Sequence, residues 1–316
     1  MKPKILVSGT IAYDRIMDFP GYFKNEILPE KIHLLNVSFF VKELKESFGG
    51  TAGNIAYNLS LLGVRPAILA LVGLKDFGIY RKWLLRNKID ISRVKAIKNQ
   101  QTASAYIITD QADNQITGFF PGAASAPVTK VLQAISYKLK TNLAIVSPQN
   151  PLDMIKLPEI FKTKKISYIF DPGQQVTSLS GSQLKKAISG SQVLIGNDYE
   201  ISLISKKTGW KISQVLNKTE ILVTTLGAKG SKIQTQKKTY KIPPAKPKNT
   251  SDPTGAGDAY RAGLIYGLLQ NWPLEKVGRL ASVVAVYTVE KYGTQTHHFS
   301  WSQLAKRYRQ NFKDKL

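Results

Sequence analysis

Short apolar runs alternate with longer amphipathic segments over most of this chain of 316 residues. The short runs are typical of buried strands, and the longer segments repeat apolar residues at helical spacing. The predicted strands are residues 5–7, 67–72, 143–146, 168–170, 193–195 and 221–224. The predicted helices are residues 54–62, 78–87, 131–139, 182–189, 199–207, 259–269 and 277–291. This order predicts an α/β fold in which helices flank a mostly parallel central sheet.

Two β-rich regions interrupt this alternation. They comprise residues 11–19 with 34–41, and residues 104–109 with 115–120. No helix is predicted between the members of a pair, and Asp113 and Asn114 suit a hairpin turn. We predict a small antiparallel sheet that stands off the main body, with segments at about 11–20, 32–47 and 103–121. The pattern leaves open whether this sheet is a lid, an edge extension or a dimer contact.

The composition is that of a globular protein. Hydrophobic residues make up 43% of the chain, which suffices for one large core, so we predict a single domain over residues 1–316. No apolar run approaches the length of a membrane span, and the chain enters its first strand without a signal segment. The absence of cysteine excludes disulfides, a thiol nucleophile and a zinc–thiolate site. We therefore expect a cytoplasmic protein without a membrane partner.

The formal net charge of +24 raises the question of a nucleic-acid partner, because clustered Lys and Arg bind phosphate backbones. The basic residues are scattered as singles and pairs, such as Lys206 with Lys207, and they form no long basic tail. The chain also has no recognisable DNA- or RNA-binding motif. We therefore expect a solvated basic surface and no nucleic-acid partner, while the positive field speeds the arrival of an anionic nucleotide.

The most informative chemistry lies where the chain enters the predicted helix at 259–269. The backbone N–H groups of Gly255, Ala256 and Gly257 precede this helix and are expected to form an anion hole. Asp258 stands in the same turn, where its charge would repel a merely bound phosphate. This favours a base that takes a proton from a hydroxyl attacking phosphorus. An Asp in a first helical turn also complements the helix dipole, so the segment alone permits a purely structural interpretation.

Two further segments place polar residues at the start of a predicted helix. Gly49 and Gly50 let the backbone approach a ligand, and Asn54 offers a donor and an acceptor to a hydroxyl-bearing molecule. Asn197 and Glu200 share one face of a helix N-terminus, where both can meet hydrated Mg²⁺ or the phosphates it carries. Ordinary helix capping explains each pair equally well when it is considered alone.

A fourth segment follows the predicted strand at 221–224. Thr225, Gly227 and Gly230 can hold a nucleotide phosphate, or they form a plain hairpin. In chain order the four segments read GG-x-x-x-N, N-x-x-E, T-x-G-x-x-G and D-x-x-G-A-G-D. In this order, and over essentially its whole length, the chain resembles the ribokinase or PfkB family of carbohydrate and nucleoside kinases. The last motif is the most specific of the four.

The resemblance implies a three-layer ribokinase-like fold with a β lid, and it assigns roles to particular residues. It makes Asp258 the catalytic base and the amides of residues 255–257 the anion hole. It implies ATP as phosphate donor, with Mg²⁺ organised by Asn197 and Glu200, largely through water. The residues implied at ATP are Thr225, Gly227 and Gly230 at the phosphates and Gly293 near the adenine, with Asn197 beside them. Those implied at the acceptor hydroxyls are Ser8, Asp14, Gly49, Gly50 and Asn54.

Two remarks concern the loop before Asp258. Several relatives bind a monovalent cation beside it, so the resemblance places a possible K⁺ near Asp252. The family usually has Thr or a similar residue where Pro253 stands, which puts the local loop geometry in question but not the chemistry. Arg261 follows one turn later, and it either faces the site or packs within the helix.

The acceptor is indicated by weaker features. The surroundings of Asp14, the Phe-rich residues 34–48, and the segments at Phe119 and at Gln174 and Gln175 look like the bacterial adenosine kinase branch. Physically, an aromatic ring can stack on a purine, and a glutamine amide can pair with the edge of a base. Lid packing and a polar loop explain these residues as well. The expected reaction is transfer of the γ-phosphate of ATP to a primary hydroxyl of a nucleoside, with adenosine giving AMP.

Two alternatives remain at this stage. One is a sugar or sugar-phosphate kinase of the same family, and the other is a nucleic-acid-binding or regulatory protein that retains the kinase fold. We expect either a monomer or a homodimer formed through the lid. The adjacent His297 and His298 are expected to be exposed and form no metal site.

Overall fold

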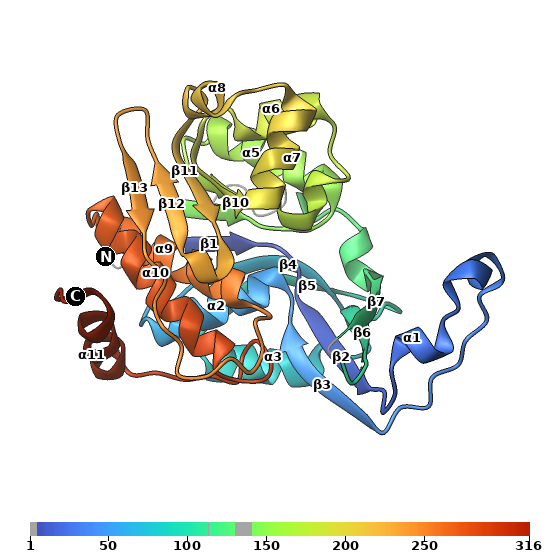
Figure 1. The fold of residues 1–316 in the computed structure, drawn as a ribbon. Coiled ribbons are helices and arrows are strands. Elements are labelled where there is room, and N and C mark those ends of the chain that lie inside the picture. Colours follow the sequence, from blue (N-terminus) through green and yellow to red (C-terminus); the bar gives the residue numbers. More distant parts are fainter. Residues whose placement is uncertain (1–4, 113, 130–140) are drawn as a thin grey trace.

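The computed structural model describes residues 5–112, 114–129 and 141–316, in which nine strands form a central sheet (Figure 1). The strands from one edge to the other are β13 (Thr239–Ile242), β12 (Ser231–Gln234), β11 (Thr219–Thr225), β10 (Ser191–Asn197), β9 (Ser167–Phe170), β8 (Leu143–Val146), β1 (Ile5–Ser8), β4 (Ala67–Gly73) and β5 (Asp90–Ile97). Pairing is parallel from β11 through β5, whereas β12 and β13 are antiparallel additions. The mostly parallel sheet and all six predicted strands are confirmed.

Helices cover both faces of this sheet. They are α2 (Thr51–Leu61), α3 (Phe77–Arg86), α5 (Pro151–Thr163), α6 (Gly181–Ile188), α7 (Asp198–Thr208), α8 (Ile212–Leu216), α9 (Ala256–Leu269), α10 (Leu274–Val289) and α11 (Trp301–Phe312). The predicted helices outside 131–139 are confirmed, and the one at 131–139 lies outside the described residues. The helices α5, α8 and α11 and the edge strands β5 and β13 were not predicted from the sequence. The polar residues of β5 lack a buried-strand pattern.

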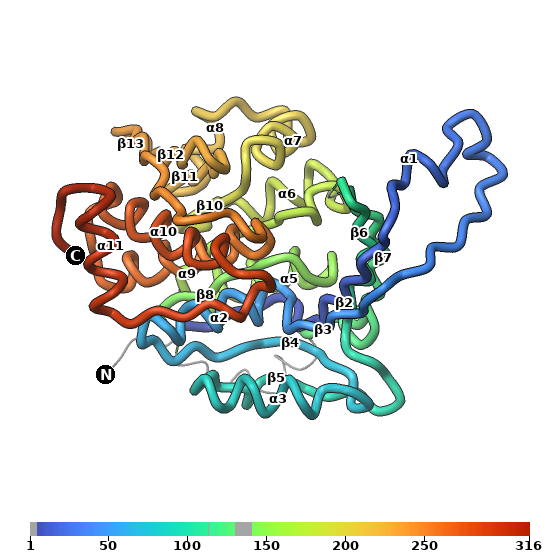
Figure 2. The backbone as a smooth tube through the Cα atoms, turned by 60° about the horizontal axis from the view of Figure 1, so that its bottom comes forward, coloured from blue at the N-terminus to red at the C-terminus, as the bar shows by residue number. Residues whose placement is uncertain are grey.

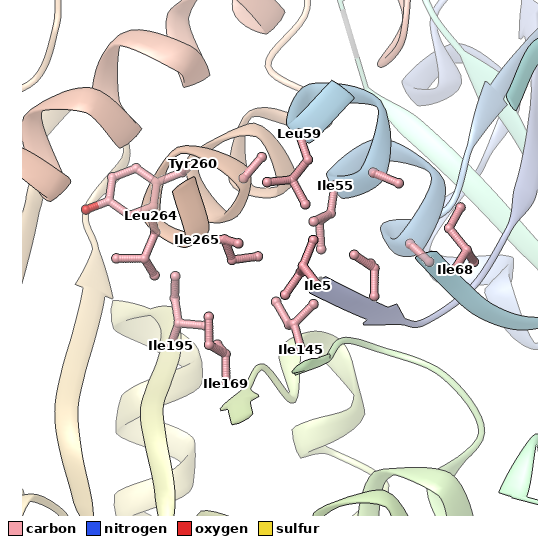
Figure 3. Close-up of a cluster of buried hydrophobic side chains, with 14 of the residues drawn as sticks. Ile5, Ile55, Leu59, Ile68, Ile145, Ile169, Ile195, Tyr260, Leu264 and Ile265 are labelled. Carbon is pink, nitrogen blue, oxygen red and sulfur yellow. The ribbon is translucent and has the colours of Figure 1, made fainter. Parts of the chain in front are cut away.

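Alternate side chains of β1 divide the core into two layers. Ile5 and Val7 pack with α2 and α9, whereas Leu6 packs on the opposite face with α5 and α6. Figure 3 shows the first layer, in which isoleucines from the five strands β1, β4, β8, β9 and β10 lie opposite apolar residues of α2 and α9. Because both faces are buried, the central strands are nearly uniform in apolar character, as expected for a parallel sheet between helices.

A second sheet stands at one end of the main body and consists of four strands among the described residues. Its order is β3 (Glu43–Gly49), β2 (Ala12–Asp18), β6 (Ala103–Thr109) and β7 (Gln115–Phe120). The β6–β7 hairpin is antiparallel as predicted, although Asp113 of its predicted turn lies outside the described residues. The prediction of a wholly antiparallel sheet is wrong, because β2 and β6 pair in parallel. β2 follows β1 and β6 follows β5, and β1 and β5 run in the same direction in the central sheet, so β2 and β6 also enter the second sheet in the same direction.

The prediction of a strand at residues 34–41 is also wrong. The partner of β2 is β3, whose register pairs Glu43 with Asp18 and leaves the residues between them outside the sheet. These residues form α1 (Phe23–Glu26), a 3₁₀ turn and an irregular return that projects from the body (Figures 1 and 2). Several apolar side chains in this projection, including Ile32 and Leu34, are exposed, and Phe40 is 83% accessible, whereas Phe23 of α1 is buried.

The loop from Asp252 to Asp258, called the anion loop below, leads into α9. Its first residues are held at the end of α10, where the N–H groups of Ser251 and Asp252 donate to the carbonyl of Val289 at 2.9 and 3.1 Å. The loop therefore lies between the packed helices α9 and α10, beside the carboxyl ends of the central strands. No helix in the described part of the chain is long and apolar enough to cross a membrane.

Candidate active site

Two cavities open beyond the carboxyl ends of the central strands, where sites of α/β sheets are expected. The first has a volume of about 520 Å³ and is lined by Thr254, Gly255 and Asp258 of the anion loop. The second has a volume of about 450 Å³ and is lined by Ala256 and Gly257 of the same loop. Molecules bound in the two cavities therefore meet at the anion loop.

The backbone of the anion loop is shaped by glycine. Gly255 caps α9 with a φ of +78°, and a Cβ at this position would lie 2.9 Å from the side chain of Thr294. The N–H of Ala256 donates to the carbonyl of Pro253 at 3.2 Å, so the predicted anion hole needs a correction: this amide closes a turn. The N–H groups of Gly255 and Gly257 have no acceptor within the described residues and remain available to an anion.

The carboxylate of Asp258 is held by Asn54. The side-chain amide of Asn54 donates to Asp258 Oδ2 at 2.9 Å. Its own oxygen accepts from Thr294 Oγ1 at 2.8 Å and from Gln295 Nε2 at 3.0 Å, which fixes the orientation of the amide. Burial raises the pKa of Asp258 to about 6, against the opposing charge of Arg261. Asp258 is therefore mostly ionised at neutral pH and basic enough to accept a proton.

Asp14 projects from β2 into the first cavity. Desolvation, with the charges of Asp258 and Asp252 adding to it, raises the pKa of the Asp14 carboxyl to about 7. A Cβ at Gly49 would overlap this carboxylate, so Gly49 makes room for Asp14. Gly49 does not line the first cavity itself, whereas Gly50 and Asn54 do. Asp14, Gly50 and Asn54 therefore lie together at the first cavity, and Gly49 contributes only by leaving space for Asp14.

The opposite wall of the first cavity carries an aromatic ring and several amides. Phe119 of β7, Gln174 and Gln175 all line it, as the sequence analysis expected. Phe119 is 55% exposed, so much of its side chain is accessible. The structure adds Gln149 and Asn150, which follow β8 and which the sequence analysis missed.

Ser8 does not line the first cavity and lies beneath Gln149 instead. Its hydroxyl donates to Gln149 Oε1 at 2.9 Å, and Gln149 Nε2 is buried without a partner in the described structure. The predicted direct contact of Ser8 with substrate is therefore corrected to an indirect one. The available signal for Gln149 was a polar residue three positions after the end of a buried strand.

The second cavity contains the T-x-G-x-x-G segment. Thr225, Gly227 and Gly230 line it together, on the turn between β11 and β12. Its far wall is apolar and includes Val286 and Val289 of α10, which suits the flat face of an adenine. Gly293 does not lie here.

Gly293 instead supports the anion loop. Its N–H donates to Asp252 Oδ2 at 3.1 Å, and the N–H of Thr254 donates to Asp252 Oδ1 at 2.9 Å. Asp252 is 9% exposed and has no ion pair among the described residues. The structure thus brings Gly293 together with Asp252 rather than with the other predicted ATP-binding residues.

Asn197 and Glu200 form a capping box at the start of α7. The Asn197 side chain accepts from the Glu200 N–H at 2.7 Å, and Glu200 Oε2 accepts from the Asn197 N–H at 2.8 Å. Neither residue lines the two cavities described above. Asn197 and Glu200 therefore do cap α7, the structural alternative considered in the sequence analysis. Glu200 Oε1 takes no part in these capping bonds.

Comparison with known proteins decides the family. The model of the pfkB family carbohydrate kinases matches residues 25–300. The chain belongs to the PfkB family. Membership makes it an ATP-dependent phosphotransferase that acts on an alcohol.

Relatives of this kinase extend over its whole length. The nucleoside kinases of Methanocaldococcus jannaschii and Methanothermobacter thermautotrophicus are each 32% identical, with 96% of this chain covered and 96% and 95% of theirs. The Burkholderia thailandensis nucleoside kinase in complex with inosine matches with a TM-score of 0.88 at 32% identity, over 98% of this chain and 99% of that one. A ribokinase from Thermotoga maritima, at 18% identity and a TM-score of 0.81, shares the fold.

The histidine prediction for this kinase is half wrong. His297 is only 1% exposed, and its Nε2 lies 2.8 Å from Asn58 Oδ1. Burial lowers the pKa of His297 to about 4, so it is neutral and supports the turn that carries Thr294 and Gln295. His298 is exposed as expected. Thr294 and Gln295 were themselves missed, because their contacts with Asn54 join distant parts of the chain.

The raised pKa of Asp14 predicts a pH dependence of acceptor binding. Below about pH 7 the carboxyl becomes protonated and loses acceptor capacity for substrate hydroxyls. We expect the acceptor Kd, measured by calorimetry without ATP, to rise as the pH falls from 8 to 6 and to be flat above 8. Asp14→Asn should bind weakly at all these pH values.

Asp18→Asn is the matched control, because Asp18 lies on the same strand but pairs with Lys45 outside the first cavity. Asp258→Asn should shift the binding transition to lower pH, since it removes a charge that raises the pKa of Asp14. A Kd that does not change between pH 6 and 8 would contradict the assignment.

Proposed function

We propose that this kinase transfers the γ-phosphate of ATP to the 5′-hydroxyl of a nucleoside, with adenosine as its favoured acceptor. The observation that carries the proposal is the first cavity, which has hydroxyl-binding residues near Asp258 and a wall of amides and an aromatic ring. A bare sugar needs only the first part, whereas a purine uses both, through stacking on Phe119 and hydrogen bonds to Gln174 or Gln175. The names of the most similar relatives, and the inosine bound by the Burkholderia enzyme, support a nucleoside.

The residues of this chain supply a direct, in-line transfer. Asp14 and Asn54 orient the acceptor, and Asp258 takes the proton of its 5′-hydroxyl as the oxygen attacks the γ-phosphorus. The bond between the γ-phosphorus and the bridging oxygen of ADP then breaks. The amides of Gly255 and Gly257 hold the charge of the phosphoryl group during the transfer.

We propose Glu200 as the residue that meets hydrated Mg²⁺. In the described residues, no cluster of three or more acidic, His or Cys side chains is able to hold an ion alone. This fits an ion that keeps several waters and is bound largely by phosphates. When bound, Mg²⁺ neutralises charge on the phosphate oxygens of ATP.

Glu200→Gln is expected to raise the Mg²⁺ concentration for half-maximal activity by about tenfold, because it weakens a contact through water. Its amide keeps an oxygen that can accept the N–H of Asn197, so the capping box survives. Asp198→Asn removes the same charge from the same helical turn and should have little effect. The assay is kcat against free Mg²⁺ at fixed ATP, and equal responses of the two variants would refute a specific role for Glu200.

We propose the anion loop as the site of a monovalent cation. The nearly buried carboxylate of Asp252, which has no ion pair among the described residues, fits a partner of this kind. A cation there would steady the loop that carries Gly255 and Gly257. We expect a higher kcat in KCl than in tetramethylammonium chloride at equal ionic strength, and equal rates would refute the proposal.

One experiment separates the possible acceptors. Adenosine, inosine, cytidine, ribose and fructose phosphates are compared by kcat/KM with Mg·ATP, and adenosine is expected to lead. Preference for ribose or a sugar phosphate would instead identify a sugar kinase. Absence of phosphorylation, together with salt-sensitive binding of DNA or RNA, would favour a regulatory protein that retains the kinase fold.

A further inference from the structure

A single buried guanidinium is bonded to both sides of the candidate site. Arg261 of α9 is 8% exposed and lies one turn after Asp258. Its Nε and Nη2 donate to the two carboxylate oxygens of Asp171, with Nη2 to Oδ1 at 2.6 Å. Its Nη1 donates to the carbonyl oxygen of Gly257 at 3.0 Å. The fork geometry of arginine allows all three bonds at once, which a lysine cannot reproduce.

The two partners of Arg261 belong to different parts of the site. Asp171 is 1% exposed, follows β9 directly and precedes the turn Gly173–Val176, where Gln174 and Gln175 line the first cavity. Gly257 belongs to the anion loop and lines the second cavity. The Arg261–Asp171 pair therefore links the turn proposed to contact the base to the loop proposed to hold the phosphate.

The desolvation of the Arg261–Asp171 pair favours a role in positioning its partners rather than in stabilising the fold. Desolvating two charges offsets much of their attraction, so a buried ion pair contributes little net stability compared with apolar packing. Bidentate contacts do, however, hold their partners in one geometry. A Cβ on Gly257 would lie 2.9 Å from Arg261 Nη1, which shows how closely the guanidinium approaches the loop.

We propose that Arg261 is a positioning residue that couples the turn Gly173–Val176 to the anion loop, so that a base seated on this turn places Gly257 and Asp258 for transfer. This inference rests on the proposed nucleoside kinase function. It requires that the base contributes to kcat and not only to binding, since energy from a remote part of a substrate is used to orient the reacting groups. Ribose, which lacks a base, is the acceptor that cannot use the coupling.

The test compares Arg261→Met and Asp171→Asn with the wild type on adenosine and on ribose. Displacement of the loop by about 1 Å is expected to lower kcat on adenosine about 10²-fold, with KM changed less than about threefold. kcat on ribose should change little, so the ratio of the two kcat values falls. Arg261→Lys keeps the charge without the fork and should give an intermediate ratio.

The pH profile provides a readout that loss of packing would not change. The charged groups around Asp258 are Arg261, Asp171 and Asp14, and Asn54 is its neutral partner. Arg261→Met removes the positive charge, so the acid limb of kcat for adenosine should move to higher pH. Asp171→Asn removes a negative charge and should move the same limb to lower pH, although both variants break the pair.

Arg307→Met is the matched control. Arg307 forms a comparably buried bidentate pair with Glu290, at the contact of α10 and α11 and outside both cavities. The Arg307→Met variant should unfold at a lower urea concentration than the wild type. Its ratio of kcat on adenosine to kcat on ribose and its pH profile should not change. The coupling would be overturned if the ratio of kcat on adenosine to kcat on ribose were unchanged in Arg261→Met and Asp171→Asn. It would also be overturned if the acid limbs of kcat of the two variants did not shift in opposite directions. Failure of the wild type to phosphorylate nucleosides would instead overturn the proposed function itself.

Discussion

Replacing Asp258 by asparagine is expected to lower kcat by about 10²–10⁴-fold, the usual contribution of a general base. The amide oxygen of the new side chain can still accept from Asn54 Nδ2, so the geometry of the site is retained. Nucleoside binding should therefore stay close to normal when Kd is measured by calorimetry without ATP. The measurement is kcat with saturating adenosine and Mg·ATP, beside that Kd.

Asp153→Asn is the control for loss of a buried carboxylate. Asp153 is 1% exposed and accepts the N–H groups of Val128 and Thr129 at 2.7 and 3.0 Å, outside both cavities. It should reduce stability but leave kcat of the folded enzyme near that of the wild type. If Asp258→Asn retains more than about a tenth of the wild-type kcat, another group accepts the proton.

Gly50→Ala is expected to combine a large loss of stability with weaker acceptor binding. Gly50 has a φ of +82° and a ψ of 142°, a region that essentially only glycine adopts, which costs about 1–3 kcal/mol for another residue. A Cβ there would also lie 2.6 Å from both the backbone nitrogen of Ala12 and the carbonyl oxygen of Thr10. These atoms belong to the chain around β2, so relief of the clash displaces Asp14 and adds about 1–3 kcal/mol.

Gly63→Ala separates the two effects of that substitution. Gly63 also has a positive φ, of +78°, but a Cβ at this position would meet nothing within 4 Å. It should cost about 1 kcal/mol, with no change in KM for the acceptor. The measurements are urea denaturation and steady-state kinetics of both variants. Equal losses of stability, or an unchanged KM in Gly50→Ala, would show that the close approach to Thr10 and Ala12 is unimportant.

The lid illustrates what local pattern alone misses. The extended character of residues 104–109 and 115–120 follows from their composition, and their hairpin was predicted from it. The parallel pairing of β2 with β6 was not, because strand direction depends on where each strand leaves the central sheet. The Phe-rich residues 34–41 look extended, yet the register of β2 with Glu43 onward leaves them outside the sheet.

In the candidate site, too, some features were predictable from local sequence and others depend on tertiary contacts. Gly255, Ala256 and Gly257 could be assigned to an anion hole from sequence, since a helix start and its glycines are local features. That the Ala256 amide is used by Pro253 depends on the turn geometry. The family resemblance implied that Ser8 contacts the acceptor, but its hydroxyl donates to Gln149, a residue 141 positions away.

Local patterns in the sequence predicted the six parallel strands at 5–7 to 221–224, most of the helices around them and the motif that contains Asp258, because strand and helix periodicity and helix-start chemistry are local. Which side chains contact the Asp258 carboxylate or hold the loop around it follows from the tertiary structure. Asn54 donates to Asp258 across 204 positions of the chain, and Asp171 accepts from Arg261 across 90 positions. Packing between elements that are distant in the sequence creates such contacts. It therefore leaves no periodic pattern in the chain from which they could be predicted.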